Sequence, residues 1–308
     1  MKKRTVATWI VAIICFLVLM IVTPSIPQSQ EYHDFADQRN FFGIPNALNV
    51  LSNVPFLVVG LIGLVLLWHG NYFKLSLEGE IWGWTFFFIG VAAVGFGSSY
   101  YHLSPDDARL VWDRLPMTIA FTSIIAIFII ERIDEKKGTL SIIPLLVAGV
   151  VSILYWRFFD DLRPYAVVQF LPCIAIPLMA ILLPPMYTHS SYWLWAAVFY
   201  LLAKVEEAMD KTIYGWTYHT VSGHTIKHVC VMCCNGSCLL DAHACQENHC
   251  IRKAKFVGDV EGLMEEDQTK WRHCRGLHYH LHKCSRNRVK LKSYSSEAGS
   301  VKYQLNVY

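Results

Sequence analysis

Charged residues are scarce in this chain of 308 residues, at 17% of the total, whereas soluble domains contain roughly 25%. The apolar residues instead gather in blocks of about 17–22, long enough to cross roughly 30 Å of hydrocarbon as a helix. Apolar and polar residues do not alternate within these blocks, so the short strands of a membrane barrel are not indicated. We therefore expect an all-α polytopic membrane protein.

The apolar part of the chain also lacks a basic patch and a cysteine pattern. It contains no run of Lys and Arg with interleaved aromatic residues, so nucleic acid is not an expected partner. Of the ten cysteines, Cys15 and Cys173 lie in apolar blocks, and the others fall between Cys230 and Cys284. A disulfide framework is therefore not expected in the apolar part.

The N-terminal region combines a basic start with a first apolar stretch. Lys2-Lys3-Arg4 precedes apolar residues from about 7 to 22. A cleaved signal peptide is one interpretation, but the stretch is long for one and no small-x-small cleavage site follows. We favour an uncleaved signal-anchor helix with its linker over residues 1–30. Either interpretation keeps the basic end in the cytosol and places residue 30 across the membrane.

The rest of the chain contains six strong candidate spans and a weaker one. The strong spans lie at about 48–68, 82–101, 115–131, 140–156, 166–184 and 191–208, and the weaker one at about 219–240. They predict a seven-helix transmembrane domain over residues 31–240, after the extra N-terminal transmembrane helix. In the weak span the apolar run stops early and Asn235-Gly236 is a turn signal. We therefore expect the last helix to be incomplete.

Residues 241–308 differ in character from the rest of the chain. They are rich in Cys, His, Lys and Arg and show no sustained hydrophobic period. Their Cys and His spacings match no zinc-finger pattern well. This composition predicts a disordered cytosolic tail.

A few polar residues fall at the ends of the predicted spans. Ser98 and His102 are four apart and share a helix face, and Asp113 comes just before the next span. His224 and His228 are also four apart, at the start of the weak span. Counting spans brings His102, Asp113, His224 and His228 to the same face of the membrane. Ionisable residues at such depth usually face the interior of a bundle.

Three neutral imidazoles with one open position form a catalytic zinc site. Such an ion lowers the pKa of bound water to about 7 and polarises a carbonyl. Asp113 could then move the water proton to a leaving amine, and Ser98 could bond the ligands or an oxyanion. Taken singly, the histidines fit an interfacial role, Asp113 fits a helix cap and Ser98 fits close helix packing. Their shared face favours the zinc interpretation over these simpler ones.

Other charged residues do not indicate a site. Lys204, Glu206 and Glu207 lie near the end of one span, where snorkelling to the interface explains them. A transporter is a further function class, but no internal repeat and no charge pair at mid-membrane is visible.

Several motifs in order resemble the alkaline ceramidase (alkaline phytoceramidase) family, part of a larger superfamily of seven-helix membrane hydrolases. They are Asn46-Ala47-Leu48-Asn49-Val50-Leu51-Ser52-Asn53, Ser98-Ser99-Tyr100-Tyr101-His102, Asp113-Arg114-Leu115-Pro116-Met117 and His224-Thr225-Ile226-Lys227-His228. The resemblance covers about residues 31–230. It implies hydrolysis of ceramide to a sphingoid base and a fatty acid, in the endoplasmic reticulum or Golgi membrane. It also implies zinc on the three histidines, with Ser98 and Asp113 as polar partners in catalysis.

Some members of that family also bind calcium through an acidic N-terminal segment. Asp34-Phe35-Ala36-Asp37 is similar in spacing, and Asn46 falls near another ligand position, which is usually acidic. The resemblance thus implies a calcium site on Asp34, Asp37 and Asn46, while an acidic loop beside the membrane is an equally good interpretation. A receptor-like or sphingolipid-binding protein of the same fold, without turnover, is the alternative function.

Overall fold

The computed structural model describes residues 14, 16, 18–69, 72–73, 75–187, 191–244, 291–295 and 301–305, and only the backbone from residue 237 onward. The chain divides into two compact units, Met1–Arg252 and Lys253–Tyr308. In the second unit, β1 (Leu291–Ser295) pairs antiparallel with β2 (Val301–Leu305). In the first unit, every described element of regular secondary structure is a helix.

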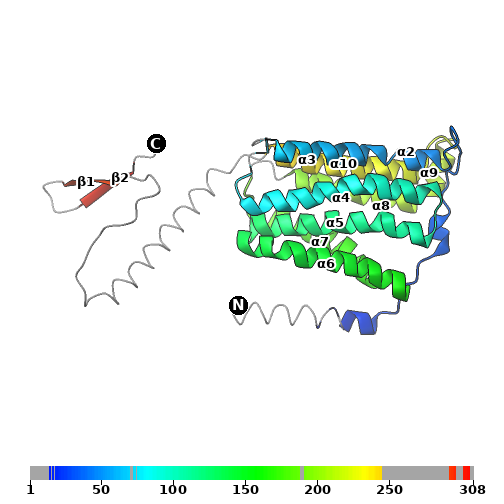
Figure 1. Cartoon of the computed structure of the whole chain (residues 1–308), viewed down its shortest axis with the longest axis horizontal. Helices are drawn as coiled ribbons and strands as arrows, with labels where there is room; N and C mark the ends of the chain where they lie inside the picture. The colour runs from blue at the N-terminus through cyan, green and yellow to red at the C-terminus, as the bar shows by residue number, and fades with distance from the viewer. Residues whose placement is uncertain are drawn as a thin grey trace. The chain divides into compact units, whose positions relative to one another are not determined.

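The first unit is a bundle of long helices lying side by side (Figure 1). The 3-10 helix η1 (Gln30–His33) and the short α2 (Ala47–Leu51) come first. The others are α3 (Val54–Trp68), α4 (Glu78–Leu103), α5 (Asp107–Arg132), α6 (Glu135–Phe159), α7 (Arg163–Leu182), α8 (Tyr192–Ala208), α9 (Asp210–Trp216) and α10 (Gly223–Ala244). α4 packs against α3 and α5, α5 against α6, and α8 against α10.

Membrane-spanning length and hydropathy are found in five described stretches. They are α2 with α3, as Ala47–Trp68, and then α4, α5, α6 and α7. The prediction of a helical protein that crosses the membrane several times is confirmed in this form. α8 has 17 residues and, like α10, is not among the five. The count of seven spans stays a prediction.

The two ends of the predicted domains are only partly described. Residues 18–22 are helical, but residues 1–13 of the predicted anchor lie outside the described residues. At the other end, α10 runs through Asn235-Gly236 to Ala244. The turn expected at this dipeptide does not form, because glycine costs an interior helical turn only about 1 kcal/mol. Most of the predicted tail lies outside the described residues.

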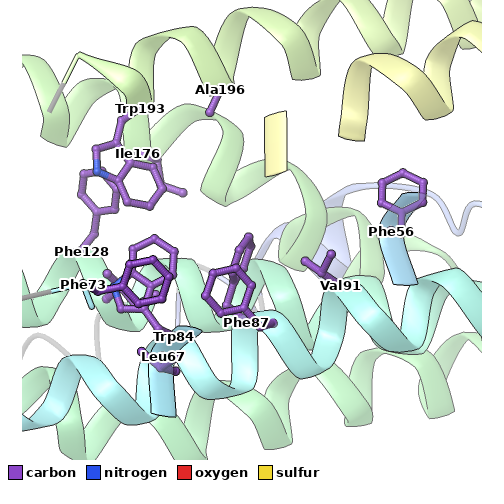
Figure 2. Close-up of a cluster of buried hydrophobic side chains, with 12 residues drawn as sticks. Phe56, Leu67, Phe73, Trp84, Phe87, Val91, Phe128, Ile176, Trp193 and Ala196 are labelled. Carbon is purple, nitrogen blue, oxygen red and sulfur yellow. The ribbon is translucent and has the colours of Figure 1, made fainter. Parts of the chain in front are cut away.

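A cluster of buried aromatic rings joins α4, α5 and α8 (Figure 2). Trp84 of α4 stacks on Trp193 of α8 with ring centroids 5.9 Å apart. Phe128 of α5 meets Trp193 edge-on at 4.6 Å. Inside a membrane, close packing of this kind holds helices together, since lipid gives no gain from excluding water. The cluster therefore fixes the three helices whose other ends carry the polar residues.

Candidate metal centre and lipid cavity

Three buried histidines from two helices form the centre of the site. His102 lies in the last turn of α4, and His224 and His228 lie one turn apart near the start of α10. One ring nitrogen of each lies within 4.8 Å of the others, and the side chains are only 1%, 3% and 4% exposed. Among the described residues, this is the one group of three or more His, Cys, Asp or Glu side chains able to hold a metal ion.

The donor set fits a zinc ion. Zinc–nitrogen bonds of 2.0–2.1 Å at tetrahedral angles separate two ligand nitrogens by roughly 3.3–3.5 Å. His102 Nε2 and His224 Nε2 are 3.3 Å apart. The Ser52 hydroxyl lies 2.6 Å from His228 Nδ1, which is the kind of orienting bond that metal-binding histidines usually make through their other nitrogen. His228 is thus left with Nε2 free for a metal.

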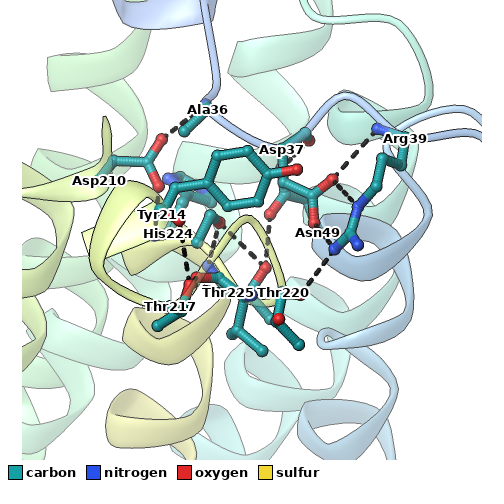
Figure 3. Close-up of polar contacts among 12 residues, drawn as sticks. Ala36, Asp37, Arg39, Asn49, Asp210, Tyr214, Thr217, Thr220, His224 and Thr225 are labelled. Carbon is teal, nitrogen blue, oxygen red and sulfur yellow. Dashed lines mark hydrogen bonds and ion pairs between the residues drawn. The ribbon is translucent and has the colours of Figure 1, made fainter. Parts of the chain in front are cut away.

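Asp210, the first residue of α9, anchors two segments at the histidines (Figure 3). Its Oδ1 accepts the backbone N–H of His224 at 2.7 Å, and its Oδ2 accepts the backbone N–H of Ala36 at 2.8 Å. His224 is the second residue of α10, where backbone N–H groups lack an acceptor within the helix. The neighbouring ring of Phe35 packs on His102 and His224, with centroids 4.8 and 4.4 Å apart.

Asn49 makes a second link between the N-terminal segment and α10. Its Nδ2 donates to the backbone carbonyl of Asp37 at 3.2 Å, and its Oδ1 accepts from the hydroxyl of Thr225 at 2.9 Å. Asn49 is fully buried, so these bonds are shielded from water. The motif around Asn49 thus orients the first turn of α10, which carries His224.

Ser98 and Asp113 meet between α4 and α5. Ser98 of α4 and Asp113 of α5 both line the same cavity as His228. A Cβ at Gly97 would collide with the backbone carbonyl of Trp112, so glycine allows the close approach of the two helices. Asp113 as a helix cap is wrong, because α5 begins at Asp107 with Asp106 as its N-cap.

The polar residues open into a cavity of about 570 Å³, within the range of small-molecule pockets. Along α4 its lining passes from Ser98 through Val94 and Val91 to Phe87, a rise of about 16 Å at 1.5 Å per residue. Along α5 it passes in the same way from Asp113 to Ile124. The cavity therefore has a polar end and a long apolar wall, which suits a lipid with a polar head.

A comparison with known protein families matches residues 43–259 to the family described as Ceramidase. The chain belongs to the ceramidase family. The match includes both helices that carry the histidines, and ceramidases are hydrolases that act on the amide bond of a lipid. Neither the curated proteins nor the solved structures that were compared match this chain.

The chain has charged residues at the cavity that the sequence did not single out as a site. Glu207 accepts from Tyr32 at 3.3 Å, from Lys204 at 2.8 Å and from Lys227 at 3.1 Å. Lys227 Nζ also lies 3.1 Å from His224 Nε2. Because Lys204 and Glu207 line the cavity, the snorkelling interpretation is wrong for them. Their spacing of three on a helix was the available signal of a shared face.

Asp37, one of the residues predicted to bind calcium, is held by an arginine. Arg39 donates to both carboxylate oxygens, from Nε at 2.8 Å and from Nη2 at 2.7 Å, and Nη2 also donates to the carbonyl of Thr220 at 2.6 Å (Figure 3). Burial alone would raise the pKa of Asp37, but the bonds from Arg39 outweigh it and the pKa is lowered.

The other two predicted calcium ligands also have protein partners. Asp34 pairs with Lys211 at 2.6 Å, and Asn46 Nδ2 donates to the backbone carbonyl of His102 at 2.8 Å. In the described structure, basic side chains hold both carboxylates and the amide of Asn46 supports the histidine helix. Calcium binding therefore stays a prediction.

Proposed function

We propose that this protein hydrolyses ceramide at a zinc ion held by His102, His224 and His228, releasing a sphingoid base and a fatty acid. The observation that supports this most is the meeting of three buried ring nitrogens beside a cavity of lipid size. A zinc ion on these nitrogens supplies a Lewis acid that polarises a carbonyl and lowers the pKa of a bound water to about 7.

Asp113 is the proton carrier in this proposal. A water oxygen adds to the acyl carbon, the carbon–nitrogen bond breaks, and the carboxylate moves the water proton to the leaving nitrogen. In this proposal the hydroxyl of Ser98, which lines the same cavity, orients the carboxylate toward the reacting atoms. Both side chains are nearly fully buried, at 8% and 2% exposed, and this shields the transferred proton from bulk water.

The apolar wall binds and orients the lipid. Residues of α4 and α5 such as Phe87, Val91 and Ile124 line it, and each methylene that they bury stabilises the complex by about 0.8 kcal/mol. With the hydrocarbon chain of the lipid held along α4 and α5, the amide of the ceramide is directed to the polar end of the cavity. This positioning places the scissile bond near Asp113 and the histidines.

We also propose seven transmembrane spans after an N-terminal anchor, in the endoplasmic reticulum or Golgi membrane, and activity of the alkaline type. α8 and α10 pack against each other within the bundle. Their charged residues Lys204, Glu207 and Lys227 line the cavity, so they lower the hydropathy of these helices without exposing charge to lipid.

The test is zinc content and hydrolysis of a labelled ceramide by the purified full chain. We expect about one zinc per chain, and loss of both zinc and product in His224→Ala and His228→Ala. The matched control is His69→Ala, an exposed histidine after α3, which should keep both. Full activity in His224→Ala would contradict the proposal.

A second candidate is a sphingolipid-binding, receptor-like protein of the same fold without turnover. One contact favours it: the Lys227 ammonium lies 3.1 Å from His224 Nε2, where it repels a divalent cation. This candidate predicts lipid binding with neither zinc nor product, so the same measurements separate the two functions.

A further inference from the structure

Arg114 is a buried cation that the proposed reaction does not use. Its side chain is 5% exposed. The guanidinium carbon lies 5.2 Å from the ring centre of Tyr32, 4.6 Å from that of Trp156 and 4.9 Å from that of Tyr165. Aromatic faces attract a cation in this way, but they accept no strong hydrogen bond from its N–H groups.

The guanidinium also has an unused donor. None of the ion pairs between described residues includes Arg114, and within the described part of the chain its Nη1 has no hydrogen-bond partner. A buried donor without a hydrogen-bond partner is costly, and Arg114 lines the cavity. A ligand oxygen that reaches Nη1 from the cavity would supply the missing acceptor.

Contacts connect this donor to the histidines. The Tyr32 ring lies under Arg114, and the Tyr32 hydroxyl donates to Glu207 at 3.3 Å. Glu207 in turn accepts from Lys227, whose ammonium lies 3.1 Å from His224 Nε2. Arg114 therefore belongs to the same polar end of the cavity as the proposed metal centre.

The charges at the cavity select the class of ligand. Three lining residues are basic, Arg114, Lys204 and Lys227, and two are acidic, Asp113 and Glu207. Positive charge is thus in excess, and a bound divalent metal would increase it. Such a site attracts an anionic head and repels an ammonium. A carboxylate matches the planar guanidinium and forms charge-assisted hydrogen bonds with it.

We propose that Arg114 binds the carboxylate of a long-chain fatty acid whose hydrocarbon lies along the apolar wall. This proposal deepens the proposed function. The ligand has two possible sources, the fatty acid product of ceramide hydrolysis and free fatty acid in the membrane, and the first of them rests on the proposed function. The two products then leave the cavity in different ways. The sphingoid base, an ammonium, is repelled from the polar end, and the fatty acid is retained there and inhibits the next turnover.

The test is equilibrium binding of labelled palmitate to the purified full chain in lipid nanodiscs. Hexadecanol and hexadecylammonium serve as probes with the same chain and a neutral or a cationic head. We expect palmitate to bind at least tenfold more tightly than either. Arg114→Gln should remove this preference and leave hexadecanol binding unchanged. The matched control is Arg157→Gln, an exposed arginine of α6, which should leave all three affinities unchanged.

Equal binding of palmitate and hexadecanol by the unaltered protein would overturn the proposal, whatever the variants do. If Arg114→Gln does not fold, Arg114→Lys carries the comparison, because it keeps the charge and lacks the planar fork. It should weaken palmitate binding severalfold and spare hexadecanol; unchanged palmitate affinity would overturn the proposal.

The source of the fatty acid is tested by turnover. Added palmitate should inhibit ceramide hydrolysis, and Arg114→Gln should relieve the inhibition. Palmitate binding should persist in His224→Ala, which is expected to be inactive. Palmitate binding in an unaltered protein that hydrolyses no ceramide would sink the proposed function and leave the carboxylate site standing. Hydrolysis without a preference for palmitate would do the reverse.

Discussion

Asp210 and His224 are joined by a hydrogen bond of 2.7 Å from the backbone N–H of the histidine to the carboxylate. The other oxygen of Asp210 accepts the backbone N–H of Ala36 at 2.8 Å. One side chain thus fixes a proposed zinc ligand and the segment whose Phe35 ring covers it. The order around the histidines therefore depends on a residue that touches no reacting atom.

Replacement of this carboxylate should loosen the metal centre. We expect Asp210→Ala to lower zinc affinity about 10–100-fold, the usual effect of losing a partner that orients a ligand, and stability by about 1 kcal/mol through the lost helix cap. Zinc titration and thermal unfolding measure the two effects. Asp134→Ala is the control, because Asp134 caps α6 through the N–H of Lys137. It should lose stability and keep zinc affinity; an equal loss of zinc affinity would contradict a positioning role for Asp210.

Loss of the proton carrier should affect turnover and not metal content. Asp113→Asn keeps the shape of the side chain and removes its basicity, so kcat should fall about 10²–10⁴-fold while zinc stays bound. Steady-state kinetics with metal analysis on the same sample decide this. Ser141→Ala in α6, whose hydroxyl bonds its own helix, should leave kcat unchanged. A kcat reduced less than threefold in Asp113→Asn would remove Asp113 from the chemistry.

The close approach of α4 and α5 should not tolerate a methyl group. In Gly97→Ala the new Cβ would collide with the carbonyl of Trp112. We expect α4 and α5 to move apart as a result, which would move Ser98 away from Asp113. We expect a loss of about 1–3 kcal/mol in stability and a larger fall in kcat than this loss of folded protein explains. Gly215→Ala is the control, since its Cβ would meet nothing within 4 Å. Wild-type kcat in Gly97→Ala would show that the spacing is not critical.

The Asp37–Arg39 ion pair should stabilise the fold at neutral pH and not in acid. The pKa of Asp37 is lowered in the folded protein, so its contribution is present above the pKa of the unfolded chain, about 3.9. It is lost as pH falls through the lower folded value. The difference in Tm between wild type and Asp37→Asn should therefore be largest near pH 7 and shrink below about pH 4. A difference that stays constant from pH 7 to pH 3 would rule out the ion pair as its cause.

Local features of the sequence were enough for the helices and for part of the site. Continuous apolar blocks predict spanning helices because hydrocarbon leaves a backbone few other ways to satisfy its hydrogen bonds. The spacing of His224 and His228 places them on one face of a helix. These inferences need no knowledge of distant contacts, and the family match is consistent with them.

Some local signals were misleading because they do not by themselves decide the structure. Asn235-Gly236 has the composition of a turn, yet it lies within α10. Lys204 and Glu207 have the composition of an interfacial cluster, yet they face the cavity. A charged residue near a helix end gives the same sequence signal whether it faces lipid headgroups or the bundle interior. Only the packing of α8 against α10 separates the two.

The sequence alone determined that the chain is a helical membrane protein and which three histidines could share a metal. Only the tertiary structure decided what surrounds them. The bond between Ala36 and Asp210 and that between Asn49 and Thr225 join residues more than 170 positions apart, and no periodicity along the chain encodes such pairs. The same holds for the rings around Arg114. Which polar atoms of a folded chain find partners, and which remain free for a ligand, depends on all the helices at once.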